Sequence, residues 1–190
     1  AEQNLKLANR KLKAHENKLM RREKLLSAIA KSNRELLVNQ DLNSAINRSL
    51  IWLGKATGVD RVYIFKNTYN EEEERYYTSQ LFEWNSGTAK AQIKNPELKN
   101  LSLDTFEKFI DPLLDKKPLV GLVKEMDKNT RKILSEQDII SILVFPIYIE
   151  DHFWGFVGFD ECKDERRWSE SERHILLSFS VTISDAIMRK

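Results

Sequence analysis

The first forty residues constrain the fold most, because they contain neither glycine nor proline and are dense in strong helix formers. Within them a leucine recurs every seven residues, at Leu5, Leu12, Leu19 and Leu26. A seven-residue repeat keeps one apolar stripe turned toward a partner helix in a left-handed coiled coil. A helix this polar is marginal alone, so the repeat predicts pairing with a second copy of the chain.

The second position of the repeat is weaker, with Ala8, His15 and Arg22 before it improves to Ile29. We therefore expect a homodimer through the N-terminal helix, with an interface formed by Leu5, Leu12, Leu19, Leu26 and Ile29. A helix that lies on its own domain remains the alternative. That interpretation suits residues 26–37 better than the polar start.

Two hairpins follow the long helix and define the fold class. Residues 59–66 and 75–84 are rich in β-branched and aromatic side chains and flank an acidic turn. Residues 139–150 and 153–162 form a second such pair, in which Pro146 predicts a bulged or exposed strand. Antiparallel hairpins with flanking helices indicate an α+β domain.

Capping residues predict where two of the helices begin or end. Asp41 is a candidate N-cap and Gly58 a stop for a second helix. Ser169 and Glu172 match the capping box that opens the last helix. Between the hairpins we expect short helices at residues 104–114 and 129–136 and a short strand at residues 119–123.

The segment from Ile139 to Asp160 resembles the GAF domain family, with its Ser, its Pro-Ile and a glycine-bearing second strand. Lys117-Pro118 and the run Arg167-Trp-Ser-Glu-Ser-Glu172 are similar to further parts of that family. The resemblance implies a six-stranded antiparallel sheet with the N- and C-terminal helices on one face. Short helices and loops cover the other face, where small ligands sit in the family. It divides the chain into a coiled-coil signalling helix, residues 1–40, and a GAF sensory domain, residues 41–190.

The same resemblance implies a regulatory sensor of a signal-transduction protein, with a two-component sensor histidine kinase as the preferred parent. The domain would bind a small molecule, or it would relay a conformational change. In either case the signal would pass to an output domain outside this chain. Both ends of the chain interrupt helical patterns, so we expect neighbouring modules. The alternative is a ligand-free transmitter and dimerisation domain of a diguanylate cyclase or similar regulator. A PAS domain is disfavoured by the amphipathic helix after Ser169.

Residues that carry chemistry are scarce, so no catalytic, metal or cofactor site is expected. The three histidines are scattered and lack the spacing of metal ligands. The single cysteine, Cys162, excludes an internal disulfide and suits a cytoplasmic location. A net charge of +2 argues against nucleic-acid binding. The longest apolar run, residues 139–149, is too short to span a membrane.

What remains is a pocket hypothesis. On the first strand Tyr63 and Phe65 point opposite to Val62 and Ile64, because side chains alternate along a strand. If the aliphatic pair faces the helices, the aromatic pair faces the ligand side. The candidate ligand-binding residues are Tyr63, Phe65, Tyr77, Phe106, Phe109 and Trp154. Filling of the core by the same residues is the competing interpretation.

Overall fold

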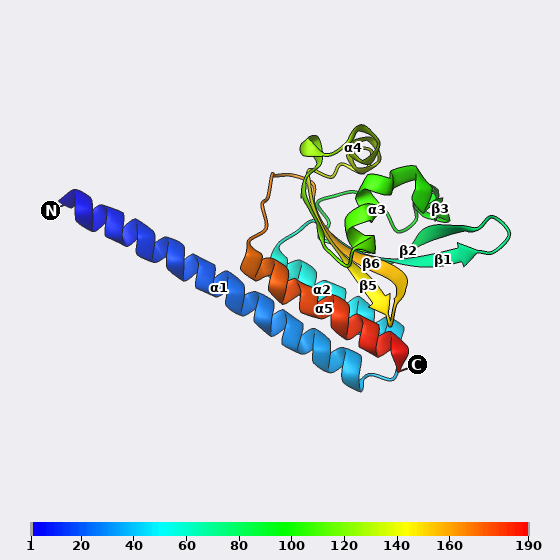
Figure 1. Ribbon diagram of the computed structural model, residues 1–190. Helices are drawn as coiled ribbons and strands as arrows, with labels where there is room; N and C mark the ends of the chain where they lie inside the picture. The colour runs from blue at the N-terminus through cyan, green and yellow to red at the C-terminus, as the bar shows by residue number, and fades with distance from the viewer. Residues whose placement is uncertain (1, 190) are drawn as a thin grey trace.

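A computed structural model describes residues 2–189 of the chain (Figure 1). The helices are α1 (Glu2–Val38), α2 (Leu42–Thr57), α3 (Glu107–Leu114), α4 (Lys128–Ser135) and α5 (Glu170–Met188). The strands are β1 (Arg61–Asn70), β2 (Arg75–Asn85), β3 (Leu101–Ser102), β4 (Leu119–Leu122), β5 (Ser141–Ile149) and β6 (His152–Glu161). The middle segment is the part of the chain between β2 and β5, residues 86–140. It also contains three short 3₁₀ turns, Pro96–Leu98, Leu103–Phe106 and Val123–Glu125.

All strands form one antiparallel sheet in the order β3-β2-β1-β6-β5-β4. The predicted α+β class and the six-stranded sheet are therefore confirmed. Strand β3 has only two residues, which is too short to leave an alternating pattern in the sequence. The hairpins β1–β2 and β5–β6 meet through β1 and β6, so these two strands form the centre of the sheet.

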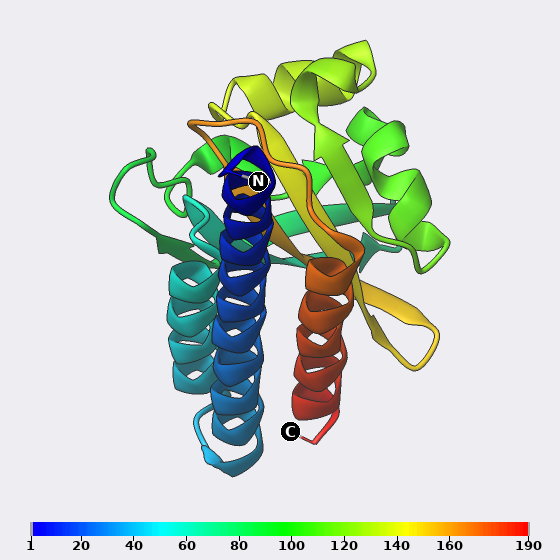
Figure 2. The same cartoon turned by 90° about the vertical axis from the view of Figure 1, so that its left-hand side faces the viewer.

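The sheet separates two apolar clusters. Helices α1, α2 and α5 lie side by side on one face (Figure 2), and the buried side chains of Val62, Ile64 and Phe159 pack against them. Helices α3 and α4 and the turns of the middle segment cover the other face, over Tyr63 and Phe65. The alternation along β1 thus divides its side chains between the two faces as the sequence predicts.

The helix ends form where the sequence places them. The Asp41 side chain accepts a hydrogen bond from the backbone N–H of Asn43 at the start of α2. Gly58 ends that helix with φ at 71°, a left-handed conformation that glycine adopts without steric cost. Ser169 and Glu172 complete a reciprocal capping box at the start of α5.

Strand β5 is irregular at the expected place. Strand β4 pairs only with residues 141–144, so Pro146 lies beyond the part of the edge that β4 covers. The register with β6 then shifts between Ile147 and Tyr148, which is a β-bulge. Both observations fit a strand that tolerates a residue without a backbone N–H.

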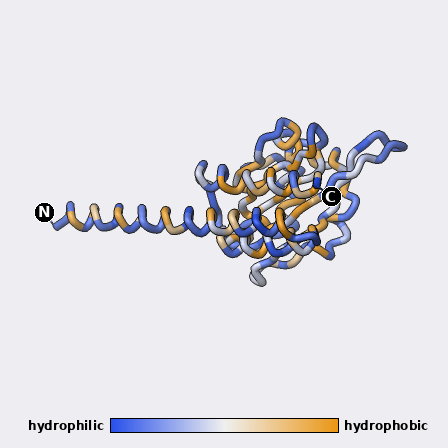
Figure 3. The backbone as a smooth tube through the Cα atoms, turned by 90° about the horizontal axis from the view of Figure 1, so that it is seen from below, coloured by the Kyte–Doolittle hydropathy of each residue, from blue (hydrophilic) through white to orange (hydrophobic). Residues whose placement is uncertain are grey.

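Helix α1 has two parts with different surroundings. Residues 2–24 are exposed throughout and extend away from the domain, as Figure 3 shows. Farther along, Leu25, Ala28, Ile29 and Leu36 are buried in the core beneath the sheet. Ile29 therefore packs in its own domain and is removed from the predicted dimer interface. The interpretation of residues 26–37 as a helix lying on its own domain fits this half of α1.

The leucine repeat lies on a separate face of α1. Leu5, Leu12, Leu19 and Leu26 are 63, 58, 51 and 49% exposed. Leu26 follows the buried Leu25 by about 100° around the helix, since an α-helix has 3.6 residues per turn. The stripe thus lies on another side of α1 than the buried core residues and is exposed along its length.

Candidate functional site

A small cavity lies between the sheet and the middle segment. Its volume is about 40 Å³. It is lined by Tyr63, Phe65, Thr78, Leu98, Leu101, Phe106, Phe109, Thr130, Ile133, Leu134, Gln137, Ile139 and Phe156. Strands β1, β2 and β6 supply the floor, and α3, α4 and the loops supply the cover. None of these lining residues carries a charge.

Four of the six predicted ligand-binding residues meet at this cavity: Tyr63, Phe65, Phe106 and Phe109. Phe65 stacks on Phe156 with ring centroids 4.9 Å apart, and Phe109 meets Phe156 edge-on at 5.7 Å. Tyr63 in turn meets Phe65 edge-on at 5.5 Å. The placement of these rings agrees with the pocket hypothesis, and their contact with a ligand remains a prediction.

Trp154 lies on the opposite face of the sheet, so its place in the predicted pocket is wrong. Tyr148 pairs with Phe153 and Ile147 with Gly155, which leaves Trp154 as the extra residue of the bulge. The bulge interrupts the alternation of β6. Phe153 consequently packs under the middle segment, and Trp154 packs against the helix-side cluster.

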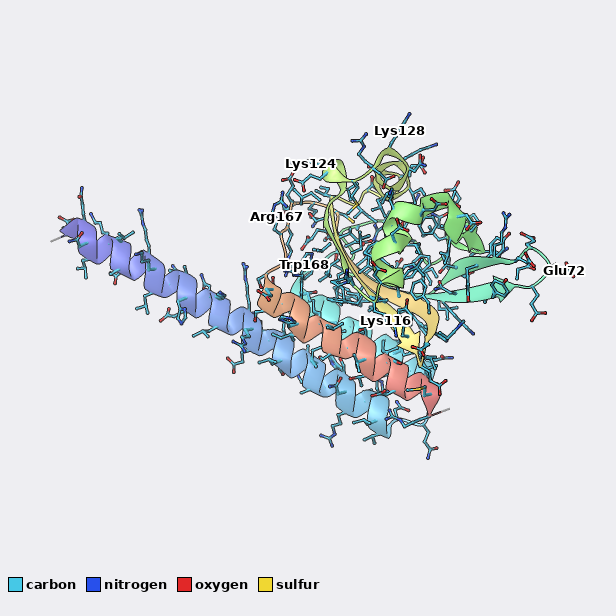
Figure 4. The ribbon with its side chains drawn as sticks, viewed as in Figure 1. Glu72, Lys116, Lys124, Lys128, Arg167 and Trp168 are labelled. Carbon is cyan, nitrogen blue, oxygen red and sulfur yellow. The ribbon has the colours of Figure 1, made fainter. Side chains whose placement is uncertain are left out.

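Tyr77 is also misplaced, for a simpler reason. Its neighbour Thr78 is buried and lines the cavity, and consecutive residues of a strand point to opposite faces. The Tyr77 hydroxyl instead donates a hydrogen bond to Glu73 at the acidic hairpin turn. Figure 4 labels Glu72 at the tip of that turn.

The sequence analysis missed the residues that cover the cavity. Thr130, Ile133, Leu134 and Gln137 line it from α4 and the residues just after it. Their spacing of three, four and seven residues places them on one helical face. That pattern was visible in the sequence, but two turns of helix give a weak signal.

Beside the cavity lies a buried ionic cluster on the two central strands. The Arg61 Nε donates to the Asp160 carboxylate at 3.2 Å, and both side chains are 1% exposed. The Tyr63 hydroxyl donates to the other Asp160 oxygen at 2.9 Å. Burial raises the pKa of Asp160 to about 7, although Arg61 and the bond from Tyr63 favour its charged form.

The Arg61 guanidinium also holds the cover of the cavity. Its two terminal nitrogens donate to the backbone carbonyl of Lys90 at 2.9 Å and to that of Gln137 at 2.8 Å. Gln137 lines the cavity, and Tyr63 forms part of its floor. Two lining residues are thus bonded directly to the Arg61–Asp160 pair.

A second arginine joins the end of the sheet to the helices. Arg166 donates to Glu161 at the end of β6 at 3.0 Å and to the capping-box residue Glu172 of α5 at 2.9 Å. It also donates to the Thr57 carbonyl at the end of α2 at 2.7 Å. Its guanidinium lies 3.8 Å from the ring centroid of Trp168. Three elements therefore meet at one side chain.

Other chemical groups are sparse in the described part of the chain. Within residues 2–189, no group of three or more His, Cys, Asp or Glu side chains could hold a metal ion. Burial raises the pKa of the Cys162 thiol to about 12. None of the described helices is both long enough and apolar enough to cross a membrane.

The fold and the placement of the cavity define a sensor-type α+β domain, and the family model for the GAF domain matches residues 41–187. The chain belongs to the GAF domain family. Over 172 residues it is 40% identical to the methanogenesis regulatory histidine kinase FilI of Methanothrix harundinacea (strain 6Ac). That match covers 90% of this chain and 19% of the relative, so the chain spans about a fifth of that kinase.

Solved structures agree on the fold. A far-red absorbing dark-state protein with bound biliverdin IXa has a TM-score of 0.69 at 17% identity, covering 85% of this chain and 98% of that one. The GAF domain of an Acinetobacter phosphoenolpyruvate-protein phosphotransferase has a TM-score of 0.64 at 16% identity, covering 86% and 92%. At such identities the likeness shows the fold alone.

Proposed function

We propose that this chain is the non-catalytic, ligand-responsive sensor and dimerisation module of a cytoplasmic sensor histidine kinase. The kinase assignment is supported by the 40% identity to a regulatory histidine kinase. The observation that carries the sensor assignment is the cavity whose lining residues Tyr63 and Gln137 are bonded to the Arg61–Asp160 pair.

The proposed signal is a shift of the helices caused by a molecule in the cavity. A ligand between the sheet and α4 displaces Gln137, and with it the Arg61 side chain on β1. Asp160 is followed directly by Glu161, which Arg166 ties to α5. The ligand changes the setting of α5 and α1 only as far as its affinities for the two arrangements differ.

The alternative is a domain that relays helix movements without a ligand. The volume of about 40 Å³ favours it, because that space holds water-sized molecules only. In this alternative the parent protein is a diguanylate cyclase or a similar regulator.

The two readings are separated by a thermal-shift screen of metabolites on the purified chain. The sensor proposal expects at least one compound to raise the melting temperature. It also expects Thr130→Phe, which fills the cavity, to abolish that rise. Thr68→Phe, at an exposed position of β1, is the control and should keep it. A broad screen without a hit, or a hit that Thr130→Phe leaves unchanged, contradicts the proposal.

A further inference from the structure

The geometry points to a ligand class for this cavity: an uncharged aromatic molecule that carries a hydrogen-bond donor. This inference rests on the proposed function, because it concerns the same cavity. It follows from the charge of the surroundings, the shape of the floor and the hydrogen-bonding groups that remain free.

An anionic ligand has no partner there. The buried cation beside the cavity, Arg61, is 1% exposed and already donates to Asp160, Lys90 and Gln137. The Lys99 ammonium, next to the lining residue Leu98, already donates to the Gln80 backbone carbonyl. The same face of the sheet carries the carboxylates of Asp160 and of Glu83, which pairs with Tyr63 in the register. Burying an anion beside them without a cation is strongly unfavourable.

A cationic ligand also lacks a partner. No carboxylate lines the cavity among the residues that the structure describes there. Both Asp160 oxygens are occupied by Tyr63 and Arg61. Glu83 accepts from the Gln92 backbone N–H at 2.9 Å and from the Gln80 amide at 2.8 Å. A cation would lose its hydration and gain no free carboxylate in return.

The floor fits a flat ring. The stacked pair of Phe65 and Phe156 is flanked by the edge-on rings of Tyr63 and Phe109. Aromatic rings favour offset-stacked and edge-to-face neighbours. A planar ring of a ligand inserted above these side chains could therefore make both stacked and edge-to-face contacts.

Two buried acceptors next to the cavity have no hydrogen-bond partner: Asn67 Oδ1 and Gln80 Oε1. In the register of β1 and β2, Asn67 lies opposite Thr78 and Gln80 opposite Phe65. Thr78 and Phe65 both line the cavity. The amide nitrogens already donate, to the Phe153 carbonyl and to Glu83, so the oxygens are the free atoms. A ligand O–H or N–H group would satisfy them.

Binding must also open the cover. A cavity of about 150 Å³ accommodates benzene, well above the roughly 40 Å³ present here. A ring therefore enters only if α4 and the neighbouring turns move away from the sheet. That movement acts on Gln137, whose carbonyl is bonded to Arg61.

The test uses four probes of similar size at pH 7: phenol, anisole, benzoate and benzylamine. Binding to the ¹⁵N-labelled full chain is followed by the backbone amide signals of Thr130, Leu134 and Gln137. We expect phenol to shift these signals and anisole, which lacks the donor, to bind about tenfold more weakly. Benzoate and benzylamine should leave them unchanged over the same concentrations.

Two variants locate the hydrogen bond. Gln80→Met and Asn67→Leu each remove one free acceptor and should narrow the preference for phenol over anisole. Gln40→Met, at an exposed position before α2, is the control and should retain the full preference.

Equal binding of phenol and anisole, or tighter binding of either charged probe, overturns the inferred ligand class. The thermal-shift screen could also find a charged metabolite whose stabilising effect is abolished by Thr130→Phe. That result would overturn the inferred ligand class and leave the sensor proposal intact. If neither the screen nor any of the four probes gives binding, both proposals fail.

Discussion

Single residues decide how closely the central strands approach each other, and Gly155 is the sharpest case. A Cβ atom at this position would lie 2.0 Å from the backbone oxygen of Phe65 on β1. Because a backbone atom cannot rotate away, Gly155→Ala should lower the free energy of unfolding by about 3 kcal/mol. Urea denaturation measures this loss.

The matched control is Gly121→Ala on β4, where the nearest atom is the flexible Met126 Cε at 3.6 Å. Its unfolding free energy should stay within about 0.5 kcal/mol of the original chain. Equal effects of the two substitutions would mean that the β1–β6 contact is looser than described.

Asp160 gives the domain a specific pH dependence. Burial raises its pKa in the folded chain to about 7, whereas an unfolded aspartate titrates near pH 3.9. Between these values the folded state holds a proton that the unfolded state has lost. The contribution of Asp160 to stability is thus full below about pH 4 and is lost as the pH rises to about 7.

The comparison that isolates this effect is Asp160→Asn, which cannot ionise. The stability of the original chain minus that of the variant should fall from pH 5 to pH 7, by at most about 1.4 kcal/mol per pH unit. Urea unfolding at several pH values gives both curves, and the histidines cancel in the difference. A difference that stays flat, or rises with pH, contradicts the raised pKa.

At the scale of elements, the connection into α5 depends on one of two adjacent arginines. The Arg166 side chain is 21% exposed and pairs with Glu161 and Glu172, which are 13% and 18% exposed. Arg166→Met would leave both half-buried carboxylates and the Thr57 carbonyl without this donor. We expect a loss of about 2–3 kcal/mol in unfolding free energy.

Arg167→Met serves as the control, because Arg167 pairs with Glu125 in an exposed bridge at 70% and 50% exposure. Arg167 and Trp168 are labelled on this connection in Figure 4. An exposed bridge of this kind contributes up to about 1 kcal/mol. In calorimetry, the melting temperature of Arg166→Met should therefore be well below that of Arg167→Met. The opposite order of melting temperatures would contradict the claim that Arg166 holds α2, β6 and α5 together.

The elements differ in how far the sequence could predict them. The caps at Asp41, Gly58 and Ser169 depend on residues within one turn of helix, so local patterns were sufficient. The side of the sheet on which Trp154 lies depends on a bulge in the pairing of two strands, which no local pattern encodes. The face of each residue in β1 was predictable because its alternation is unbroken on the β6 side.

The candidate site was predictable only in part, for the same reason. Its aromatic floor followed from alternation along one strand. Its cover depends on how α4 docks over the sheet, and its buried Arg61–Asp160 pair joins residues 99 positions apart. Contacts at that separation are set by the assembled sheet and leave no short motif.

At the scale of the whole molecule, α1 combines two roles that truncation can separate. Residues 2–24 are exposed throughout and carry Leu5, Leu12 and Leu19 of the leucine stripe, whereas residues 25–36 supply core side chains. Deleting residues 1–24 should therefore leave the melting temperature nearly unchanged, while deleting residues 1–38 should unfold the domain. Circular dichroism distinguishes these outcomes.

The same division predicts the state of association. The original chain should have about twice the monomer mass of 22.3 kDa by analytical ultracentrifugation, and the chain without residues 1–24 should be a monomer. Leu12→Lys combined with Leu19→Lys should also give a monomer, because two charges then replace the centre of the apolar stripe. Gln3→Lys with Asn17→Lys adds the same charge on the side of the helix away from the stripe and should remain a dimer. A dimer that survives both the truncation and the leucine substitutions would place the interface elsewhere, and the heptad repeat would then have no part in pairing.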